Sequence, residues 1–486
     1  MSKEIRTLEP KALWNNFANL NEVPRGSKKE ERVIDFMVQF GKKLNLETII
    51  DPVGNVIIKK PASKGMENRK TVVMQSHLDM VHQKNANTDF DFDTEGINML
   101  IDGDWVTADG TTLGADNGLG VAAIMSVLES DTMQHPAIEA LFTIDEETGM
   151  TGAMGLQAGY LEGEILLNLD TEEDDEIDIG CAGGIDISAG ITYNEVNTPP
   201  NTSGFKISVT GLNGGHSGMD IHKGLGNANK IMNRILFELK DLIRINEIDG
   251  GSLRNAIPRE SFSKIVVYNS NITKFKKIVE FIGGEIKKEL EAVEANLTFT
   301  IEEIELPKKV MTTISQETLV RVIYAVFNGV YKMSHTMEDL VETSNNLARV
   351  LVKDENIEIL CLTRSSSESS KMDLVNLISS NFQLGGYQVE TSGSYPGWQP
   401  NVNSPILNVL RTKYEEMFNE IPKVVACHAG LECGILGTNY PEMDMISFGP
   451  TITGAHSPDE RAHIGSSQKF WKYLTEILKS IPNKAH

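Results

Sequence analysis

The sequence has few cysteines, no long apolar run and fewer basic than acidic residues, and each shortage argues against a class of protein. Only 4 of its 486 residues are cysteine. No apolar run is long enough to span a bilayer. Its 45 Lys and Arg residues against 68 Asp and Glu give a net charge of −23. A negative charge of this size argues against nucleic acid or an anionic membrane as a main partner.

The cysteines and the N-terminal segment both point to a cytoplasmic protein. The segment MSKEIRTLEP contains no apolar stretch of the kind found in secretory signal peptides. We therefore expect reduced, partly buried thiols. Two of them flank His428 in CHAGLECG, but their spacing is not that of a zinc ribbon, and we predict no metal there. The four cysteines are Cys181, Cys361, Cys427 and Cys433.

The pattern of predicted strands and helices changes twice along the chain. A chain of 486 residues is too long for one ordinary core, so two domains are expected. Residues 1–184 alternate apolar strands with helices, which is typical of an α/β sheet covered by helices. Residues 185–392 combine half-exposed strands with long amphipathic helices, and the α/β texture returns at residues 393–486. The sequence predicts an α/β domain interrupted by an inserted α+β domain.

The inserted region contains an internal similarity. Its first part has the order strand, helix, strand, strand, helix, strand, which is typical of an α+β sandwich. The segment TSNNLARVLVKDENIEILCLTR at 343–364 resembles DGGSLRNAIPRESFSKIVVY at 249–268. We therefore expect a second, weaker copy of the same unit to follow the first.

Histidines and carboxylates stand at the ends of several predicted strands. In open α/β sheets, ligands bind outside the carboxyl ends of the strands. Two histidines and several carboxylates suit a divalent transition metal, zinc above all. Five ligands with one shared carboxylate would hold two metals, as in co-catalytic hydrolases. The residues are His77 and Asp79 in TVVMQSHLDMV, Asp116 in TTLGADNGLG, Glu146 and Glu147 in LFTIDEETG, Asp170 in ILLNLD, and His456 in ISFGPTITGAHSPDE.

Each of these residues also has a simpler interpretation when it is taken alone. A histidine at the end of a strand is commonly a hydrogen-bonded structural residue, and an aspartate before a helix is commonly a cap. Asp-Glu-Glu is usually a solvated turn, and Asp170 also begins an acidic run. Their joint occurrence at successive strand ends favours the metal site.

The order and the amino-acid sequences of these motifs resemble those of the dinuclear zinc peptidases of the M20 family. The resemblance covers nearly the whole chain. The matching motifs are SHLDMV, LGADNGLGVA, DEETGMTGA, LNLDTEE and GAHSPDE. Within the family, the large inserted domain with CAGGID, YPGWQPN and CHAGLECG is similar to the bacterial aminoacyl-histidine dipeptidases, which cleave Xaa-His dipeptides such as carnosine. The resemblance implies a zinc-peptidase catalytic domain with a mixed sheet covered by helices, interrupted by a lid domain that looks duplicated.

The resemblance also implies a metal content and a ligand set. It implies two Zn²⁺ per chain, with Co²⁺ or Mn²⁺ as substitutes. In this implied set, Asp116 would bridge both metals. His77 and Asp170 complete one site, and Glu147 and His456 complete the other.

Two further residues of the same motifs carry implied roles in catalysis. Residues two apart in an extended chain point the same way, and Asp79 is expected to orient His77 through its second ring nitrogen without touching metal. Glu146 is the implied general base, which takes a proton from a water bridging the metals and passes it to the leaving amine. The neighbouring side chains of Glu146 and Glu147 should therefore point apart.

Two local features of the backbone are also expected. The resemblance implies a cis peptide bond between Asp116 and Asn117, a rare feature outside proline. In HSPDE, Ser457 has the character of a helix N-cap, Pro458 of a first helical residue and Glu460 of a capping-box partner. The sequence therefore predicts a helix that begins directly after His456.

The lid domain carries three candidate substrate-binding residues. LNGGHSGMD matches the lid motif of the family, and the resemblance implies that His216 donates to the oxygen of the scissile carbonyl. Arg364 matches the lid arginine that pairs with the free carboxylate of the substrate, with an ordinary surface arginine as the alternative. Asn255 in RNAIP is a similar candidate.

The loop CHAGLECG departs from the GGT loop of many relatives. It fits the Xaa-His subfamily, and Glu432 is a candidate for binding the imidazole or the amine of the substrate, with a structural hydrogen bond as the alternative. In many relatives lid residues reach the site of a partner subunit. A homodimer through the lid is therefore one candidate state, and a chain that supplies its own second half is the other.

The resulting hypothesis is a dizinc dipeptidase that hydrolyses unblocked dipeptides with C-terminal histidine, such as β-Ala-His. Its partner is a small peptide, with no nucleic acid and no membrane. The alternatives are an M20 relative with another substrate, such as a tripeptide aminopeptidase or an N-acyl-amino-acid amidohydrolase, and a metal-dependent binding protein without catalysis. The second glutamate of DEE argues against a pure binding protein, because a binder has no use for it.

Overall fold

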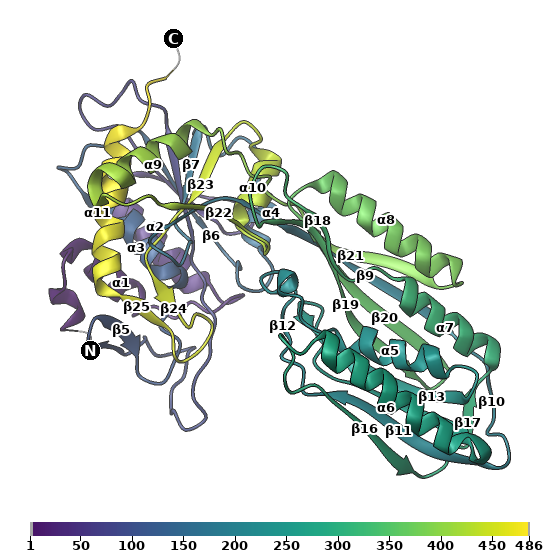
Figure 1. Cartoon of the computed structure of the whole chain (residues 1–486). Coiled ribbons are helices and arrows are strands. Elements are labelled where there is room, and N and C mark those ends of the chain that lie inside the picture. The colour runs from purple at the N-terminus through teal and green to yellow at the C-terminus, as the bar shows by residue number, and fades with distance from the viewer. Residues whose placement is uncertain (1–2, 485–486) are drawn as a thin grey trace. The chain divides into compact units, whose positions relative to one another are not determined.

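The chain forms two compact units in the computed structural model, which describes residues 3–484 (Figure 1). The first unit consists of the chain up to Gly180 with residues 400–426 and 431 onward. The inserted unit consists of residues 181–399 with the short segment 427–430. This segment comes from the CHAGLECG loop, and nothing in its sequence indicated that it belongs with the inserted unit.

An eight-stranded mixed sheet forms the centre of the first unit, with the order β1-β2-β6-β3-β7-β23-β8-β22. β3 lies parallel between β6 and β7, and β23 lies parallel to β7. All residues of β3, β6 and β7 are buried, as expected for apolar runs in the parallel part of a sheet. The strands are β1 (Glu47–Ile50), β2 (Val56–Lys60), β3 (Val72–His77), β6 (Ile138–Thr143), β7 (Ile165–Asn168), β8 (Glu176–Cys181), β22 (Lys423–Cys427) and β23 (Asp444–Ser447).

Helices pack against this sheet. α3 contacts β3 and α1, while α9 contacts β23 and α11. α3 is buried along nearly its whole length, which agrees with its largely apolar sequence from Leu119 to Leu128. None of the helices in the described part of the chain has the length and apolar character needed to cross a bilayer. The helices are η1 (Ile5–Thr7), α1 (Lys11–Leu20), α2 (Glu31–Lys43), α3 (Ala115–Glu129), α4 (Thr151–Gly155), α9 (Pro405–Phe418), α10 (Glu432–Asn439) and α11 (Ile464–Ser480).

The prediction of a helix directly after His456 is wrong. A small sheet of β24 (Ile452–Thr453), β25 (Arg461–His463), β5 (Trp105–Ala108) and β4 (Met99–Asp102) takes its place. β25 pairs with β5, which satisfies its backbone polar groups without a helix. Ser457 instead donates to the carbonyl of Gly454, and the next helix is capped by His463, which accepts from the Ser466 N–H.

The sheet of the inserted unit has two halves with the same internal order. Its nine strands follow the path β16-β11-β15-β13-β19-β20-β9-β21, with β18 beside β19. Read from the two edges inward, β16-β11-β15-β13 corresponds to β21-β9-β20-β19, and β13 joins β19 at the centre. The first strand of the second half, β9, precedes the first half in the chain. The similarity therefore follows the fold, and the copies are not consecutive in sequence.

Four helices cover one face of this sheet (Figure 1). The helices are α5 (Ala228–Leu239), α6 (Ile272–Glu289), α7 (Thr313–Ala325) and α8 (Glu368–Leu384), with the short turns η2 (Ile221–Lys223) and η3 (Asn269–Asn271). The strands are β9 (Gly183–Thr192), β10 (Glu195–Asn197), β11 (Thr202–Thr210), β12 (Gly215–His216), β13 (Ile243–Gly251), β14 (Ala256–Ile257), β15 (Ser261–Tyr268), β16 (Thr298–Ile304), β17 (Lys309–Met311), β18 (Gly329–Met333), β19 (Val341–Lys353), β20 (Asn356–Ser365) and β21 (Gln388–Tyr395).

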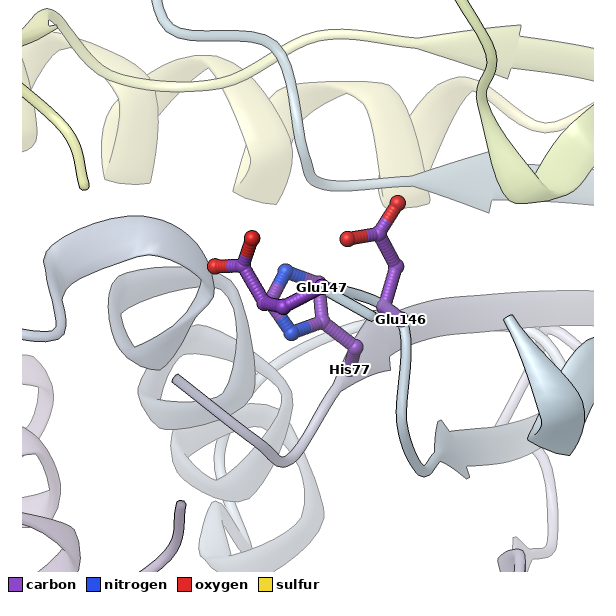
Figure 2. A group of neighbouring side chains, drawn as sticks. All are labelled: His77, Glu146 and Glu147. Carbon is purple, nitrogen blue, oxygen red and sulfur yellow. The ribbon is translucent and has the colours of Figure 1, made fainter. Parts of the chain in front are cut away.

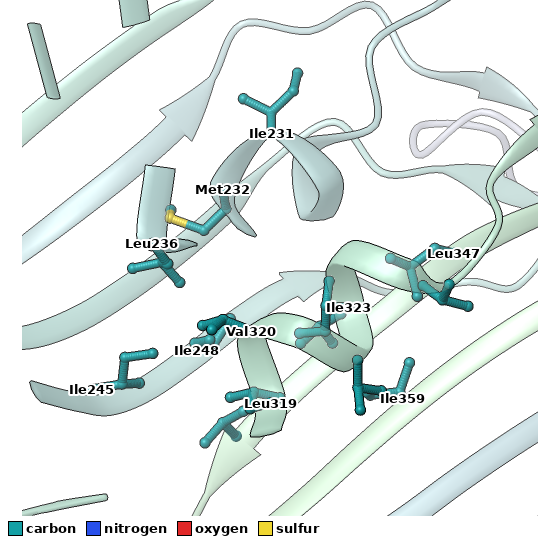
Figure 3. Packing of buried hydrophobic residues seen from close by; sticks show 14 of the residues in the cluster. Ile231, Met232, Leu236, Ile245, Ile248, Leu319, Val320, Ile323, Leu347 and Ile359 are labelled. Carbon is teal, nitrogen blue, oxygen red and sulfur yellow. The ribbon is translucent and has the colours of Figure 1, made fainter. Parts of the chain in front are cut away.

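One continuous apolar core lies between these helices and the sheet, and Figure 3 shows part of it. We expect Leu319→Ala in α7, which truncates a fully buried side chain, to lower the free energy of unfolding by about 2–5 kcal/mol. Ile314→Ala on the same helix is the matched control, because that side chain is 80% exposed, and its effect should stay within about 0.5 kcal/mol. Denaturant unfolding followed by circular dichroism measures both. Equal effects would mean that α7 does not pack as described.

Candidate metal centre

Four groups of side chains in the described part of the first unit have the composition and spacing of metal sites, and two of these groups share Asp116. His77, Asp116 and Asp170 form one group, and Asp116, Glu147 and His456 form the other. Within each group the potential ligand atoms lie within 4.8 Å of one another. The residues come from the carboxyl ends of β3, β6 and β7, from the start of α3, and from the loop after β24, as the strand-end argument predicts.

The shared carboxylate turns one oxygen toward each histidine. Oδ1 of Asp116 lies 3.1 Å from Nε2 of His77, and Oδ2 lies 3.2 Å from Nε2 of His456. The same histidine nitrogens lie 3.6 Å from Asp170 Oδ1 and 2.9 Å from Glu147 Oε2. Each histidine therefore faces one carboxylate of its own as well as the shared one.

The electrostatics of this cluster are those of a site built for cations. Burial raises the pKa of the Asp170 carboxyl well above its ordinary value, and nearby carboxylates add to the rise. Hydrogen bonds to Asp116 and Glu147 raise the pKa of His456 to about 11. Burial opposes the charged form of His77, but Asp170 and Asp116 outweigh it and raise its pKa as well. The carboxylates thus favour the protonated, positively charged form of both histidines. A divalent cation bound between these side chains would supply positive charge directly.

The donor set fits two divalent metals. Each group offers one imidazole nitrogen and carboxylate oxygens, the ligands that zinc takes in catalytic sites. The residues that can hold one metal are His77, Asp116 and Asp170, and those that can hold the other are Asp116, Glu147 and His456.

Asp79 lies behind the first histidine and supports the loop after β6. Its Oδ1 lies 3.3 Å from Nδ1 of His77. Its two oxygens accept the backbone N–H groups of Glu146 and Glu147 at 3.0 and 3.2 Å, and it also accepts from the Ser27 hydroxyl at 2.8 Å. One buried carboxylate therefore holds both the imidazole and the two neighbouring glutamates.

The neighbouring glutamates point in different directions, as Figure 2 shows. The two carboxylates are separate in this view, and an oxygen of each lies within 4.8 Å of the other and of a ring nitrogen of His77. Burial raises the pKa of the Glu146 carboxyl to about 8, although the charge of His77 opposes the rise, and Glu432 and Glu147 add to it. Glu146 is thus a carboxyl group with an unusually high proton affinity at the edge of the cluster.

The backbone around the ligands has unusual geometry at three positions. One of these was expected from the sequence, and the other two were not. The peptide bond between Asp116 and Asn117 is cis, which confirms the prediction. The Asn117 amide donates to the Leu169 carbonyl at 2.7 Å and to the Asp170 carboxylate. Asp145 and His456 have φ angles of 54° and 63°, a region that non-glycine residues rarely adopt, and no sequence pattern indicated them.

The three candidate substrate-binding residues of the inserted unit lie close together within that unit. β12 pairs with β14, so that His216 faces Ala256, and the N–H of Ser217 donates to the Asn255 carbonyl at 2.7 Å. Arg364 at the end of β20 donates through Nε to the Ser217 hydroxyl at 3.4 Å. Arg364 is only 5% exposed, so the alternative of an ordinary surface arginine is excluded.

The CHAGLECG loop places its two polar residues in different units. Glu432, in the first unit, is fully buried and accepts from Gln75 Nε2 and Thr143 Oγ1, both at 2.6 Å. Its other oxygen has no hydrogen-bond partner among the described residues, and burial raises its pKa to about 7. His428, in the inserted unit, shares a 2.8 Å hydrogen bond with the Ser344 hydroxyl.

Comparison with known families decides the classification of the chain. The model of the family described as "Peptidase family M20/M25/M40" matches residues 73–480. The chain belongs to this family. It is 45% identical over 484 residues to the cytosol non-specific dipeptidase of Escherichia coli (strain K12), covering 99% of this chain and 100% of the relative.

Solved structures of two peptidases agree with the fold. The aminoacylhistidine dipeptidase from Vibrio alginolyticus superimposes with a TM-score of 0.94 at 43% identity, and all of both chains is covered. An aminopeptidase from Bacillus cereus superimposes with a TM-score of 0.58 at 15% identity, covering 98% of this chain and 99% of that one. The second likeness shows the shared fold alone.

Three residues beside the two groups that share Asp116 were not predicted to contribute to them, of which two are buried and Ser27 is half-buried. These are Arg25, Ser27 and Glu460. Ser27 lies in the polar segment before α2, where no spacing rule marks a functional residue. Glu460 was interpreted as a helix cap, and its acidic side chain in GAHSPDE was the available signal.

Proposed function

We propose that this M20 peptidase is a dizinc dipeptidase that hydrolyses unblocked dipeptides, with those ending in histidine among its preferred substrates. The observation that carries the proposal is Asp116, whose two carboxylate oxygens face the two histidines, while Glu146 lies beside His77 and Glu147 and outside both groups that share Asp116. The names of the two full-length relatives from Escherichia coli and Vibrio alginolyticus support a dipeptidase and, for the second, the aminoacyl-histidine class.

We assign the metals to the two groups that share Asp116. Zinc is favoured by the mixture of imidazole and carboxylate ligands, and cobalt or manganese are substitutes with the same preferences. Two bound zinc ions would polarise the scissile carbonyl and lower the pKa of the attacking water.

Glu146 is proposed as the general base. Its carboxylate takes a proton from the attacking water while the water oxygen bonds to the carbonyl carbon. When the C–N bond breaks, the same carboxyl group returns the proton to the leaving amine nitrogen. The Asp79 carboxylate fixes the backbone of Glu146 and the ring of His77, which positions the base relative to a ligand.

The inserted unit is proposed to act as a lid. His216 would donate to the carbonyl oxygen as negative charge develops on it. Arg364, supported by the Tyr395 hydroxyl at 2.8 Å, would bind the free carboxylate of the dipeptide, and Asn255 would assist. Glu432, in the first unit, is proposed to bind the amine or the imidazole of the substrate.

We expect Arg364→Ala to raise KM for dipeptides by about 10–100-fold, because a charged hydrogen bond contributes about 1.5–3 kcal/mol. His216→Ala should instead lower kcat by about 10²–10³-fold, with the zinc content of both variants unchanged. Steady-state kinetics on Gly-His measures the difference. Arg321→Ala is the matched control, since that arginine pairs with Glu317 on the surface of α7. Normal kinetics in both lid variants would show that these residues do not bind substrate.

A hydrolysis panel tests the proposed function. The panel contains β-Ala-His, Gly-His, other unblocked dipeptides, tripeptides and N-acetyl amino acids, each with added zinc and after chelation. We expect zinc-dependent cleavage of the unblocked dipeptides. Preferred cleavage of tripeptides or N-acetyl amino acids would assign another M20 substrate class, and zinc binding without any hydrolysis would indicate a binding protein.

The remaining proposals concern location and assembly. We propose a cytoplasmic enzyme that acts on small peptides and uses neither nucleic acid nor membrane. A homodimer through the inserted unit is the proposed assembly, and light scattering of the purified protein tests it. A monomer would favour the alternative, in which the second half of the inserted unit takes the place of the residues that a partner subunit would supply.

A further inference from the structure

One buried carboxylate accepts four consecutive backbone N–H groups at the start of α3. Oε2 of Glu460 accepts from Leu113 and Gly114 at 2.7 and 2.9 Å, and Oε1 accepts from Ala115 and Asp116 at 2.8 and 3.2 Å. The first N–H groups of a helix have no partner inside the helix, and negative charge is favourable beside them. Both oxygens of Glu460 are thus used by the turn that carries Asp116, and Glu460 belongs to neither metal-binding group.

A buried guanidinium binds a carbonyl of the same turn. Nη2 of Arg25 donates to the carbonyl of Gly114 at 2.6 Å, while Nη1 donates to the carbonyls of Leu78 and Asp79 at 3.1 and 3.2 Å. Arg25 is 1% exposed. The guanidinium therefore connects the segment that follows His77 to the turn before Asp116.

Two glycines of LGADNG provide the space for this guanidinium. Gly114 has a φ angle of 70°, and a Cβ at this position would lie 2.4 Å from Nη2 of Arg25. A Cβ at Gly118 would lie 2.7 Å from the same atom. These distances are below any van der Waals contact, so a side chain at either position would displace the guanidinium from its present place.

The charges of Arg25 and Glu460 offset each other around a cluster that is already acidic. Burial lowers the pKa of Arg25 to about 10, and Glu460 is the charge that most opposes this fall. The guanidinium therefore stays protonated at neutral pH. Burial raises the pKa of the Glu460 carboxyl, and its hydrogen bonds to the N–H groups of the turn oppose this rise.

We propose that Arg25 and Glu460 are positioning residues, which hold the turn Leu113–Asp116 so that the Asp116 carboxylate faces both metals. Glu460 lies four residues after His456, so the same contacts also fix the loop of the second histidine. Neither residue touches substrate in this proposal, which rests on the proposed dizinc site.

Zinc titration of the metal-free protein tests the proposal. Glu460→Gln keeps the size of the side chain but replaces one acceptor oxygen by a donor, so part of the turn loses its acceptor. We expect zinc affinity, measured in competition with a chromophoric chelator, to fall by about 10–100-fold at both sites. With saturating zinc, kcat for Gly-His should fall while KM changes little.

Glu139→Gln is the matched control. Glu139 lies near the start of β6, at the end of the strand away from the cluster, and its buried carboxylate accepts hydrogen bonds from the N–H groups of Glu162 and Gly163 at 2.8 and 2.9 Å. The substitution should lower the unfolding temperature and leave zinc affinity unchanged. If Glu460→Gln behaves like Glu139→Gln, or binds zinc as the unmodified protein does, the inference is overturned.

Arg25→Lys provides a second measurement, which decides the matter if Glu460→Gln does not fold. Lysine keeps the charge but replaces the guanidinium fork with a single nitrogen, so zinc affinity should again fall by about 10-fold or more. Unchanged affinity in Arg25→Lys overturns the inference. If the unmodified protein itself fails to bind two zinc ions, the proposed function fails, which is a separate result.

Discussion

The Glu146→Gln protein is expected to bind two zinc ions with unchanged affinity and to lose turnover by about 10²–10⁴-fold. Glutamine keeps the size and shape of the side chain but cannot accept a proton from water. Glu146 lies outside both groups that share Asp116, although an oxygen of its carboxylate lies within 4.8 Å of ligand atoms of His77 and Glu147. The loss should therefore appear in kcat and leave metal binding intact.

Glu147→Gln is the matched comparison, because it makes the same chemical change one residue away. Glu147 lies 2.9 Å from His456 within the second group, and a neutral ligand there should weaken one zinc site. Activity should then fall through loss of metal and recover partly at high zinc. Zinc content by mass spectrometry and kcat on Gly-His measure both variants. If Glu146→Gln loses zinc and Glu147→Gln keeps it, the two roles are exchanged, and normal turnover of Glu146→Gln refutes the proposed mechanism.

The parts of the fold that sequence predicts well are those determined by local pattern. The buried runs of β3, β6 and β7 are recognisable because central strands of a parallel sheet are apolar on both faces. Their carboxyl ends must meet at one edge of the sheet, which is why residues far apart in sequence could be collected into one candidate site. The position of Asp116 between two histidines then followed from the resemblance and not from spacing alone.

The parts that sequence did not predict depend on contacts between distant segments. The segment after His456 forms β25 because β5, more than 350 residues earlier in the chain, offers a strand to pair with; its local signals favoured a helix. Arg25 and Glu460 were missed for the same reason, since their partners are backbone groups of a remote turn. Backbone groups leave no residue-type signal in the sequence.

The internal similarity of the inserted unit shows the same limit. The two hairpins at its centre were recognised because each is a continuous segment. The correspondence of β9 with β11 was not, because β9 precedes the first half in the chain and joins the second half only through pairing with β20.

Removal of the shared carboxylate should affect both metals, whereas removal of one histidine should affect one. Asp116 is the member common to both groups, so Asp116→Ala leaves each with two of its three side chains. We expect this variant to retain less than one zinc ion after dialysis and to show no measurable turnover. His456→Ala leaves the group of His77, Asp116 and Asp170 intact, and it should retain about one zinc ion with strongly reduced activity.

The effect of these two substitutions on protein stability can be measured separately from their effect on zinc binding. The His456 side chain is 55% exposed, so its removal should leave the unfolding of the metal-free protein nearly unchanged. His335→Ala, at an exposed histidine of the inserted unit, controls for histidine loss in general and should bind two zinc ions. Zinc content measured beside the unfolding temperature of the metal-free proteins distinguishes ligand loss from misfolding. An Asp116→Ala protein that is folded and keeps two zinc ions would exclude the bridging role, and one that keeps a single tightly bound zinc ion would assign Asp116 to only one of the two sites.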